Sequence, residues 1–131
     1  MKTTLISSAI LIILISSMSF AQTKKTEDSI KPIVTFVELG SVNCIPCKQM
    51  QPVMKAIEKK YGAQVKVIFY DVWENDQKHY AEKYDIRLIP TQVFLDSDGK
   101  EFFRHEGFYP ETEIDKLLQS RGLKPNKLNK G

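Results

Sequence analysis

The sequence has little of what many functional classes require. Its 131 residues include two cysteines, two histidines and one tryptophan, and they contain no internal repeat or low-complexity segment. The 19 basic and 16 acidic residues are interleaved, with a formal net charge of +3, so nucleic-acid binding has little support. A structural zinc site would have to use Cys44, Cys47, His79 and His105, but the histidines lack finger spacing. We therefore expect no metal.

The N-terminal segment is uncharged from Thr3 to Thr23 and follows a single lysine, Lys2. Its short apolar centre, with small residues at Ser19 and Ala21, is typical of a signal peptide over residues 1–21. The run is also long enough for an uncleaved membrane anchor, which stays open as the alternative. No cysteine lies nearby for lipid attachment. We expect an exported protein, periplasmic or otherwise extracytoplasmic, where disulfides persist.

The rest of the chain is long enough for one domain with a single modest core. We expect an extension over 22–32, a domain over 33–122 and a polar, disordered tail over 123–131. Hydrophobic periodicity predicts strands at 33–39, 65–70, 91–96 and 100–105, and helices at 44–61, 76–84 and 110–120. The Asp98-Gly99 step predicts a hairpin, which makes the sheet mixed. This order predicts an α/β fold, with a central four-stranded sheet flanked by helices on both faces.

The two cysteines, Cys44 and Cys47, stand three positions apart at the start of the first predicted helix. A bridge between them closes a very small loop, so it constrains the unfolded chain little and serves poorly as a staple. The helix N-terminus stabilises a thiolate, and the spacing lets one sulfur reach the other. Pro46 stiffens the turn without removing a needed donor. The pair is therefore interpreted as redox-active.

At this point the chain resembles the thioredoxin family. The segment ELGSVNCIPCKQMQPV is similar to the family's active-site segment, with an acid six residues before the first cysteine and a proline eight after it. Glu38 and Pro52 occupy those positions. The sequence Ile89-Pro90-Thr91 matches the family's cis-proline, and Gly107 matches a glycine that lets the last strand approach the active site. The resemblance covers about residues 33–118 and implies a thioredoxin-like fold.

The resemblance also implies roles for these residues. Cys44 would be the nucleophile, Cys47 the resolving thiol, and Glu38 the buried carboxylate that takes the proton of Cys47. Burial would raise the pKa of such a carboxyl group towards neutrality. Pro90 in cis would set the backbone of Ile89 beside the sulfurs to pair with a substrate strand.

Some positions depart from the family pattern. Asn43 stands where most members carry tryptophan, so substrate contacts should differ. Phe69 stands where a lysine commonly partners the buried acid, which should leave the pKa of Glu38 higher still. The stretch DVWENDQKH is about two residues longer than its usual counterpart. Its Trp73 and His79, and likewise His105, receive no role from the sequence.

The resemblance favours an exported thiol:disulfide oxidoreductase with a Cys44/Cys47 dithiol-disulfide cycle and no other cofactor. The proline before the second cysteine resembles the reducing members of the family, so we expect a reductase of protein disulfides. Its expected electron donor is a membrane thiol-transporting protein, and we expect a monomer that binds no nucleic acid. Two alternatives stay open: a disulfide oxidase or isomerase, and a redox-inactive binding module.

Overall fold

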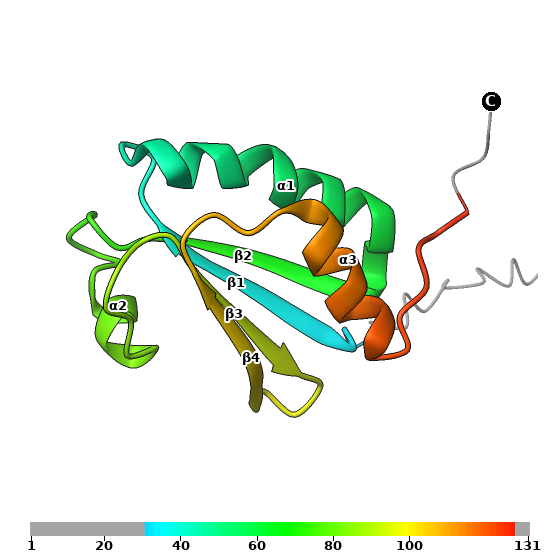
Figure 1. The fold of residues 1–131 in the computed structure, drawn as a ribbon. Helices are drawn as coiled ribbons and strands as arrows, with labels where there is room; N and C mark the ends of the chain where they lie inside the picture. The colour runs from blue at the N-terminus through cyan, green and yellow to red at the C-terminus, as the bar shows by residue number, and fades with distance from the viewer. Residues whose placement is uncertain (1–30, 128–131) are drawn as a thin grey trace, which may run out of the picture.

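A computed structural model describes residues 31–127, and within them the elements alternate much as the sequence predicts (Figure 1). The order is β1 (Val34–Gly40), α1 (Ile45–Tyr61), a 3-10 turn η1 (Gly62–Gln64), β2 (Val65–Asp71), α2 (His79–Lys83), β3 (Thr91–Asp96), β4 (Glu101–Glu106) and α3 (Glu111–Ser120). No helix in this range has the length and apolar character needed to cross a membrane. The predicted signal peptide lies outside the described residues.

The four strands form one mixed sheet in the order β2-β1-β3-β4, which confirms the predicted architecture. β1 pairs with β2 in parallel, and β3 pairs antiparallel with both β1 and β4. The hairpin turns at Gly99, whose φ of 80° suits a residue without a Cβ. Its N–H donates to the carbonyl of Asp96 at 2.9 Å. Because β1 lies between β2 and β3, its C-terminal end is flanked by strands on both sides. The candidate site lies at this end of the sheet.

Helices cover both faces of the sheet, with α1 and α3 on one side and α2 on the other (Figure 1). Alternation along β1 sends Phe36 into the core beneath α1 and α3, and Val37 and Leu39 into the core beneath α2. Phe36 stacks on Phe94 of β3 at a centroid distance of 4.8 Å. Both faces of the central strand are therefore buried, and its position relative to α1 is fixed.

The second helix is shorter than predicted, His79–Lys83 instead of 76–84. The residues before it form turns in which the N–H groups of Gln77 and Lys78 donate to the carbonyl of Glu74. The Gln77 side chain also accepts the backbone N–H of Asp71 at 3.0 Å. This bond ties the loop to the end of β2, so the segment does not continue as a regular helix.

The expectation of disorder from residue 123 is wrong as far as Lys127. Leu123 is only 2% exposed and belongs to the core beneath α1 and α3. The Gln64 side chain bonds both the N–H and the carbonyl of Lys124, and the N–H of Asn126 donates to the carbonyl of Lys60. A single buried leucine and a few backbone hydrogen bonds thus order a tail whose composition is polar.

Candidate functional site

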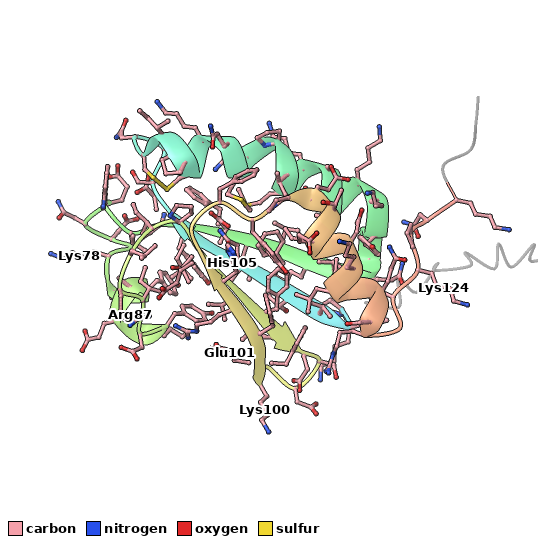
Figure 2. All side chains as sticks on the ribbon, viewed as in Figure 1. Lys78, Arg87, Lys100, Glu101, His105 and Lys124 are labelled. Atoms are coloured by element: carbon pink, nitrogen blue, oxygen red, sulfur yellow. A yellow bond between two sulfur atoms is a disulfide. The ribbon has the colours of Figure 1, made fainter. Side chains whose placement is uncertain are left out.

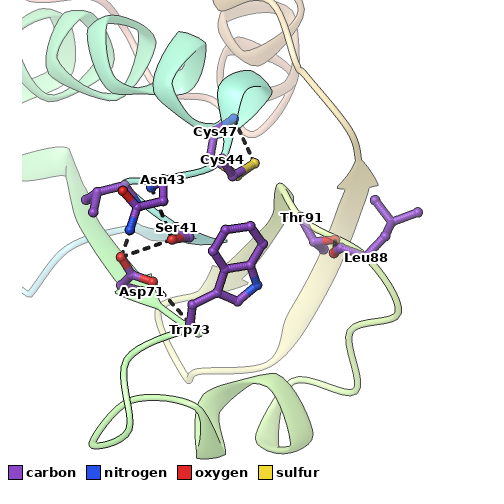
Figure 3. Close-up of a disulfide and its surroundings, with 9 residues drawn as sticks. Ser41, Asn43, Cys44, Cys47, Asp71, Trp73, Leu88 and Thr91 are labelled. Carbon is purple, nitrogen blue, oxygen red and sulfur yellow. Dashed lines mark hydrogen bonds between the residues drawn. A yellow bond between two sulfur atoms is a disulfide. The ribbon is translucent and has the colours of Figure 1, made fainter.

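The cysteine pair lies where β1 gives way to α1, at the C-terminal edge of the sheet (Figure 3). Cys44 is the N-cap of α1, with extended backbone angles, and Cys47 lies in the first turn. The two are joined by a disulfide with a Cα–Cα distance of 5.2 Å. The backbone N–H of Cys47 donates to the Cys44 sulfur at 3.3 Å. On reduction, the same N–H and the helix dipole favour a thiolate at Cys44.

The two sulfurs differ in their access to solvent. Cys44 is 8% exposed and Cys47 is fully buried at 0%. Pro46 lies in the first turn of the helix, where its missing N–H leaves no intrahelical bond unmade. An incoming disulfide therefore meets Cys44 first, because Cys47 exposes no surface.

The loop before β3 brings the other predicted residues to the same edge of the sheet. The Ile89–Pro90 peptide is cis, as the resemblance implied. The carbonyl of Pro90 accepts the N–H of Gly107 at 2.7 Å, which joins this loop to the end of β4. Gly107 has a φ of 89°, but a Cβ there would meet no atom within 4 Å. The glycine is thus required by its backbone conformation, and the close approach expected from the resemblance is not the reason.

Glu38 is fully buried in the middle of β1, on the face that α1 covers. Burial raises its pKa to about 8, with a smaller opposing contribution from the side chain of Gln92. Neither carboxylate oxygen has a hydrogen-bond partner within 3.5 Å among the described residues. Phe69 is its neighbour in register on β2, so no lysine is paired with it there. A carboxyl group in this setting can hold or accept a proton near neutral pH.

Gly40, two residues beyond Glu38 on the same face, lies against the buried sulfur. A Cβ on Gly40 would stand 3.1 Å from Sγ of Cys47 and 3.4 Å from the ring of Phe69. These distances are tighter than ordinary van der Waals contact, so the first turn of α1 packs against the backbone of β1 here. The strand that carries Glu38 and the turn that carries Cys47 are therefore in direct contact.

The sequence analysis missed Asp71, which organises the loop before the cysteines (Figure 3). Its carboxylate accepts the N–H of Val42 at 3.0 Å, the N–H of Trp73 at 3.1 Å and the hydroxyl of Ser41 at 3.3 Å. Burial opposes ionisation, but these bonds outweigh it and lower the pKa of Asp71 below its ordinary value. The sequence signals this role only by an acid at the end of a buried strand, because two of the three partners, Ser41 and Val42, lie 30 and 29 residues away.

We expect Asp71→Ala to destabilise the protein by about 2 kcal/mol, because three donors lose a charged acceptor in a partly buried loop. The loss would be measured by urea unfolding of the oxidised protein. Asp98→Ala is the matched control, since Asp98 lies in the exposed hairpin turn and, among residues 31–127, its side chain pairs only with the exposed Lys31. Equal midpoints for the two variants would contradict the structural role of Asp71.

The two histidines lie apart, His79 at the start of α2 and His105 on β4. Within residues 31–127, no three histidine, cysteine or acidic side chains gather as metal ligands would. His105 contacts the buried side chain of Gln92. His79 lies against Tyr80 of its own helix, with ring centroids 4.1 Å apart.

A cysteine pair that caps a helix, is asymmetrically exposed and lies at the same end of a four-stranded mixed sheet as a cis-proline is typical of the class of thiol-disulfide oxidoreductases. Residues 20–122 match the family described as "Thioredoxin-like domain", so the chain belongs to this family.

The chain is also similar to individual thioredoxins, both in sequence and in structure. The thioredoxin of Bacillus subtilis is 33% identical over 75 residues, covering 57% of this chain and 69% of the relative. The thioredoxin of Staphylococcus saprophyticus is 27% identical over 93 residues, covering 71% and 86%. Among solved structures, a point-mutant thioredoxin from Halobacterium salinarum superimposes with a TM-score of 0.59 at 25% identity, covering 76% of this chain and 84% of that one. The chain is a thioredoxin-like thiol-disulfide oxidoreductase with a CxxC pair.

Proposed function

We propose that the protein is a reductase of protein disulfides that acts outside the cytoplasm. The main support for attack by Cys44 is the difference in exposure between the two cysteines, 8% for Cys44 and 0% for Cys47. The proline before Cys47 and the signal-peptide pattern of residues 1–21 support reduction and export. The cycle uses no cofactor beyond the two thiols.

The proposed cycle has two exchange steps. The thiolate of Cys44 attacks one sulfur of a substrate disulfide, forms a mixed disulfide and releases the other substrate sulfur as a thiolate. Cys47 then loses its proton to the ionised fraction of Glu38 and attacks the Cys44 sulfur. This step closes the Cys44–Cys47 disulfide and releases the second substrate thiolate. Two electrons pass from the dithiol to the substrate, and a membrane thiol-transporting protein is the proposed source that restores them.

The surroundings of the disulfide suit an extended polypeptide. Large apolar side chains stand exposed at this end of the molecule: Val42, Ile45, Trp73, Leu88 and Phe108. Trp73, which is 60% exposed, lines a surface pocket of about 280 Å³ together with Leu88 and Ile89. Among the described residues no backbone hydrogen bond engages Ile89, so its N–H and carbonyl are free to pair with a substrate strand. Ile89, Pro90, Pro46 and Gly107 are the proposed substrate-contacting positions.

The reduction potential of the Cys44/Cys47 pair tests the direction of electron flow. We expect the full chain, equilibrated in dithiol/disulfide buffers, to titrate below about −220 mV, on the side of the reducing thioredoxins. A potential above about −160 mV would make the protein an oxidant or isomerase instead. The Cys44→Ser/Cys47→Ser double variant supplies the baseline. A pair with no reversible titration would leave only a redox-inactive binding module.

Export is tested separately, by fractionation of cells that make the full chain. We expect the protein outside the cytoplasm and shortened by the 21 residues of the predicted signal peptide. Full-length protein in the membrane fraction would instead support the uncleaved anchor, and full-length protein in the cytoplasm would overturn export.

A further inference from the structure

Three polar side chains form a row across the sheet, one from each of three neighbouring strands. Glu38 on β1 pairs in register with Gln92 on β3, and Gln92 pairs in register with His105 on β4. Directly paired residues of an antiparallel sheet share a face, so all three point to the side that α1 and α3 cover. Glu38 and Gln92 are each fully buried. Apolar side chains fill the next pair along the same strands, where Phe36 stacks on Phe94.

His105 is held in one orientation at the end of this row. Its ring stacks on Tyr109, with centroids 4.2 Å apart and planes within 13°. In Figure 2 it lies over the sheet in the middle of the view, whereas the labelled charged side chains stand at the rim. Its Nδ1 lies 3.2 Å from Oε1 of Gln92. Because an amide oxygen only accepts, a hydrogen bond in this arrangement requires the tautomer, or the imidazolium, in which Nδ1 carries a proton.

In the contact with His105, the Gln92 amide presents its oxygen to the ring. With Oε1 turned to His105, Nε2 is turned away from it, and Nε2 has no hydrogen-bond partner among the described residues. Both oxygens of Glu38, the next side chain in the row, also lack a partner in that range. A buried donor and a buried acceptor without partners therefore stand in neighbouring positions. Without the histidine, the amide could rotate and present its oxygen to the carboxylate.

We propose that His105 is a positioning residue of the redox site, which acts through Gln92 to favour the carboxylate form of Glu38. The inference rests on the proposed role of Glu38 as proton acceptor. An amide N–H directed at a carboxylate favours its charged form, whereas an amide oxygen in the same place disfavours it. The Nδ1 proton is present in the neutral tautomer that bonds Gln92 and in the imidazolium, so the orientation persists in either state of His105.

Among the described residues, the buried amide nitrogens without a partner are Nε2 of Gln92 and Nε2 of Gln51 on α1, and of the two residues only Gln92 pairs in register with Glu38. On β2 the register partner of Glu38 is Phe69, and the turn of α1 that carries Cys47 packs against Gly40, two residues further along β1. Asp71, at the end of β2, is engaged by the loop through Ser41, Val42 and Trp73. The segment after β4 contributes Tyr109, which stacks on His105. Gln92 is thus the polar side chain best placed to set the charge of Glu38.

The test follows the titration of Glu38 itself in the oxidised full chain, by ¹³C NMR of glutamate carboxyl groups, with Glu38→Gln to assign the signal. His105→Phe keeps an aromatic ring against Tyr109 and removes the donor. We expect it to raise the titration midpoint of Glu38 by about 0.5 to 1 pH unit. His105→Asn keeps an N–H donor near the position of Nδ1, and we expect its midpoint within about 0.3 pH unit of the parent.

A midpoint that His105→Phe leaves unchanged, or that His105→Asn raises as far, would overturn the inference. Gln92→Leu gives an independent route: it should raise the midpoint by itself and abolish any further effect of His105→Phe. Additive shifts would show that His105 acts without Gln92. The oxidised protein performs no exchange during this measurement, so a failed reductase assay and a failed positioning role are distinguishable.

Discussion

Cys44→Ser is expected to abolish disulfide reduction, with a loss of at least about a thousandfold in the second-order rate constant towards a protein disulfide. The reason is that the serine hydroxyl stays protonated at neutral pH, whereas the N-cap position favours a thiolate at Cys44. Cys47 cannot substitute, because it is 0% exposed within the first turn of α1. The measurement is the initial rate of insulin disulfide reduction with a chemical dithiol as electron donor.

Cys47→Ser should behave differently, although it also stops turnover. Cys44 can still attack, but nothing resolves the mixed disulfide, so a covalent adduct with the substrate protein should accumulate. Non-reducing electrophoresis and intact mass spectrometry measure that adduct, and the double variant is the control. If Cys44→Ser formed the adduct and Cys47→Ser did not, the roles assigned from exposure would be reversed.

The sequence predicted most of the fold because each element has a local signal. Apolar residues recur at helical spacing along α1, β-branched and aromatic residues mark the strands, and the Asp98-Gly99 step marks the hairpin. The cis peptide at Pro90 has no such signal, since few X-Pro bonds are cis, and only the family resemblance predicted it. Local chemistry thus determines element types, and the resemblance supplied the loop geometry.

Features that depend on tertiary contacts were not predictable from the sequence. Asp71 acts through the loop at Ser41 and Val42, which the parallel pairing of β1 and β2 brings beside it. The link between His105 and Gln92 requires the register of β3 with β4. Leu123 packs into the core where its N–H donates to Leu118, and Gln64 and Lys60 hold the backbone that follows it. In each case the relevant partner lies on another segment of the chain, which only the fold brings beside it.

Glu38→Gln is expected to change how stability depends on pH. The pKa of Glu38 is raised from 4.5 to about 8 by burial, so between these values the folded protein holds a proton that the unfolded chain has lost. The free energy of unfolding should then fall by about 1.4 kcal/mol per pH unit as pH rises through this window. It should level off above pH 8. Glutamine carries no titrating group, so the variant should lack this slope.

The difference between the two proteins isolates Glu38, because the other titrating groups are shared. We expect the free energy of unfolding of Glu38→Gln to rise relative to that of the parent between pH 5 and pH 8. The rise should be a few kcal/mol, at most about 5. Urea unfolding of the oxidised proteins at several pH values measures this gain. Glu58→Gln removes the same charge from the exposed face of α1 and should show no comparable gain. A Glu38→Gln curve parallel to that of the parent would mean that Glu38 has the same pKa in the folded and unfolded states, and a carboxylate with its ordinary pKa is too weak a base to take the proton of Cys47 near neutral pH.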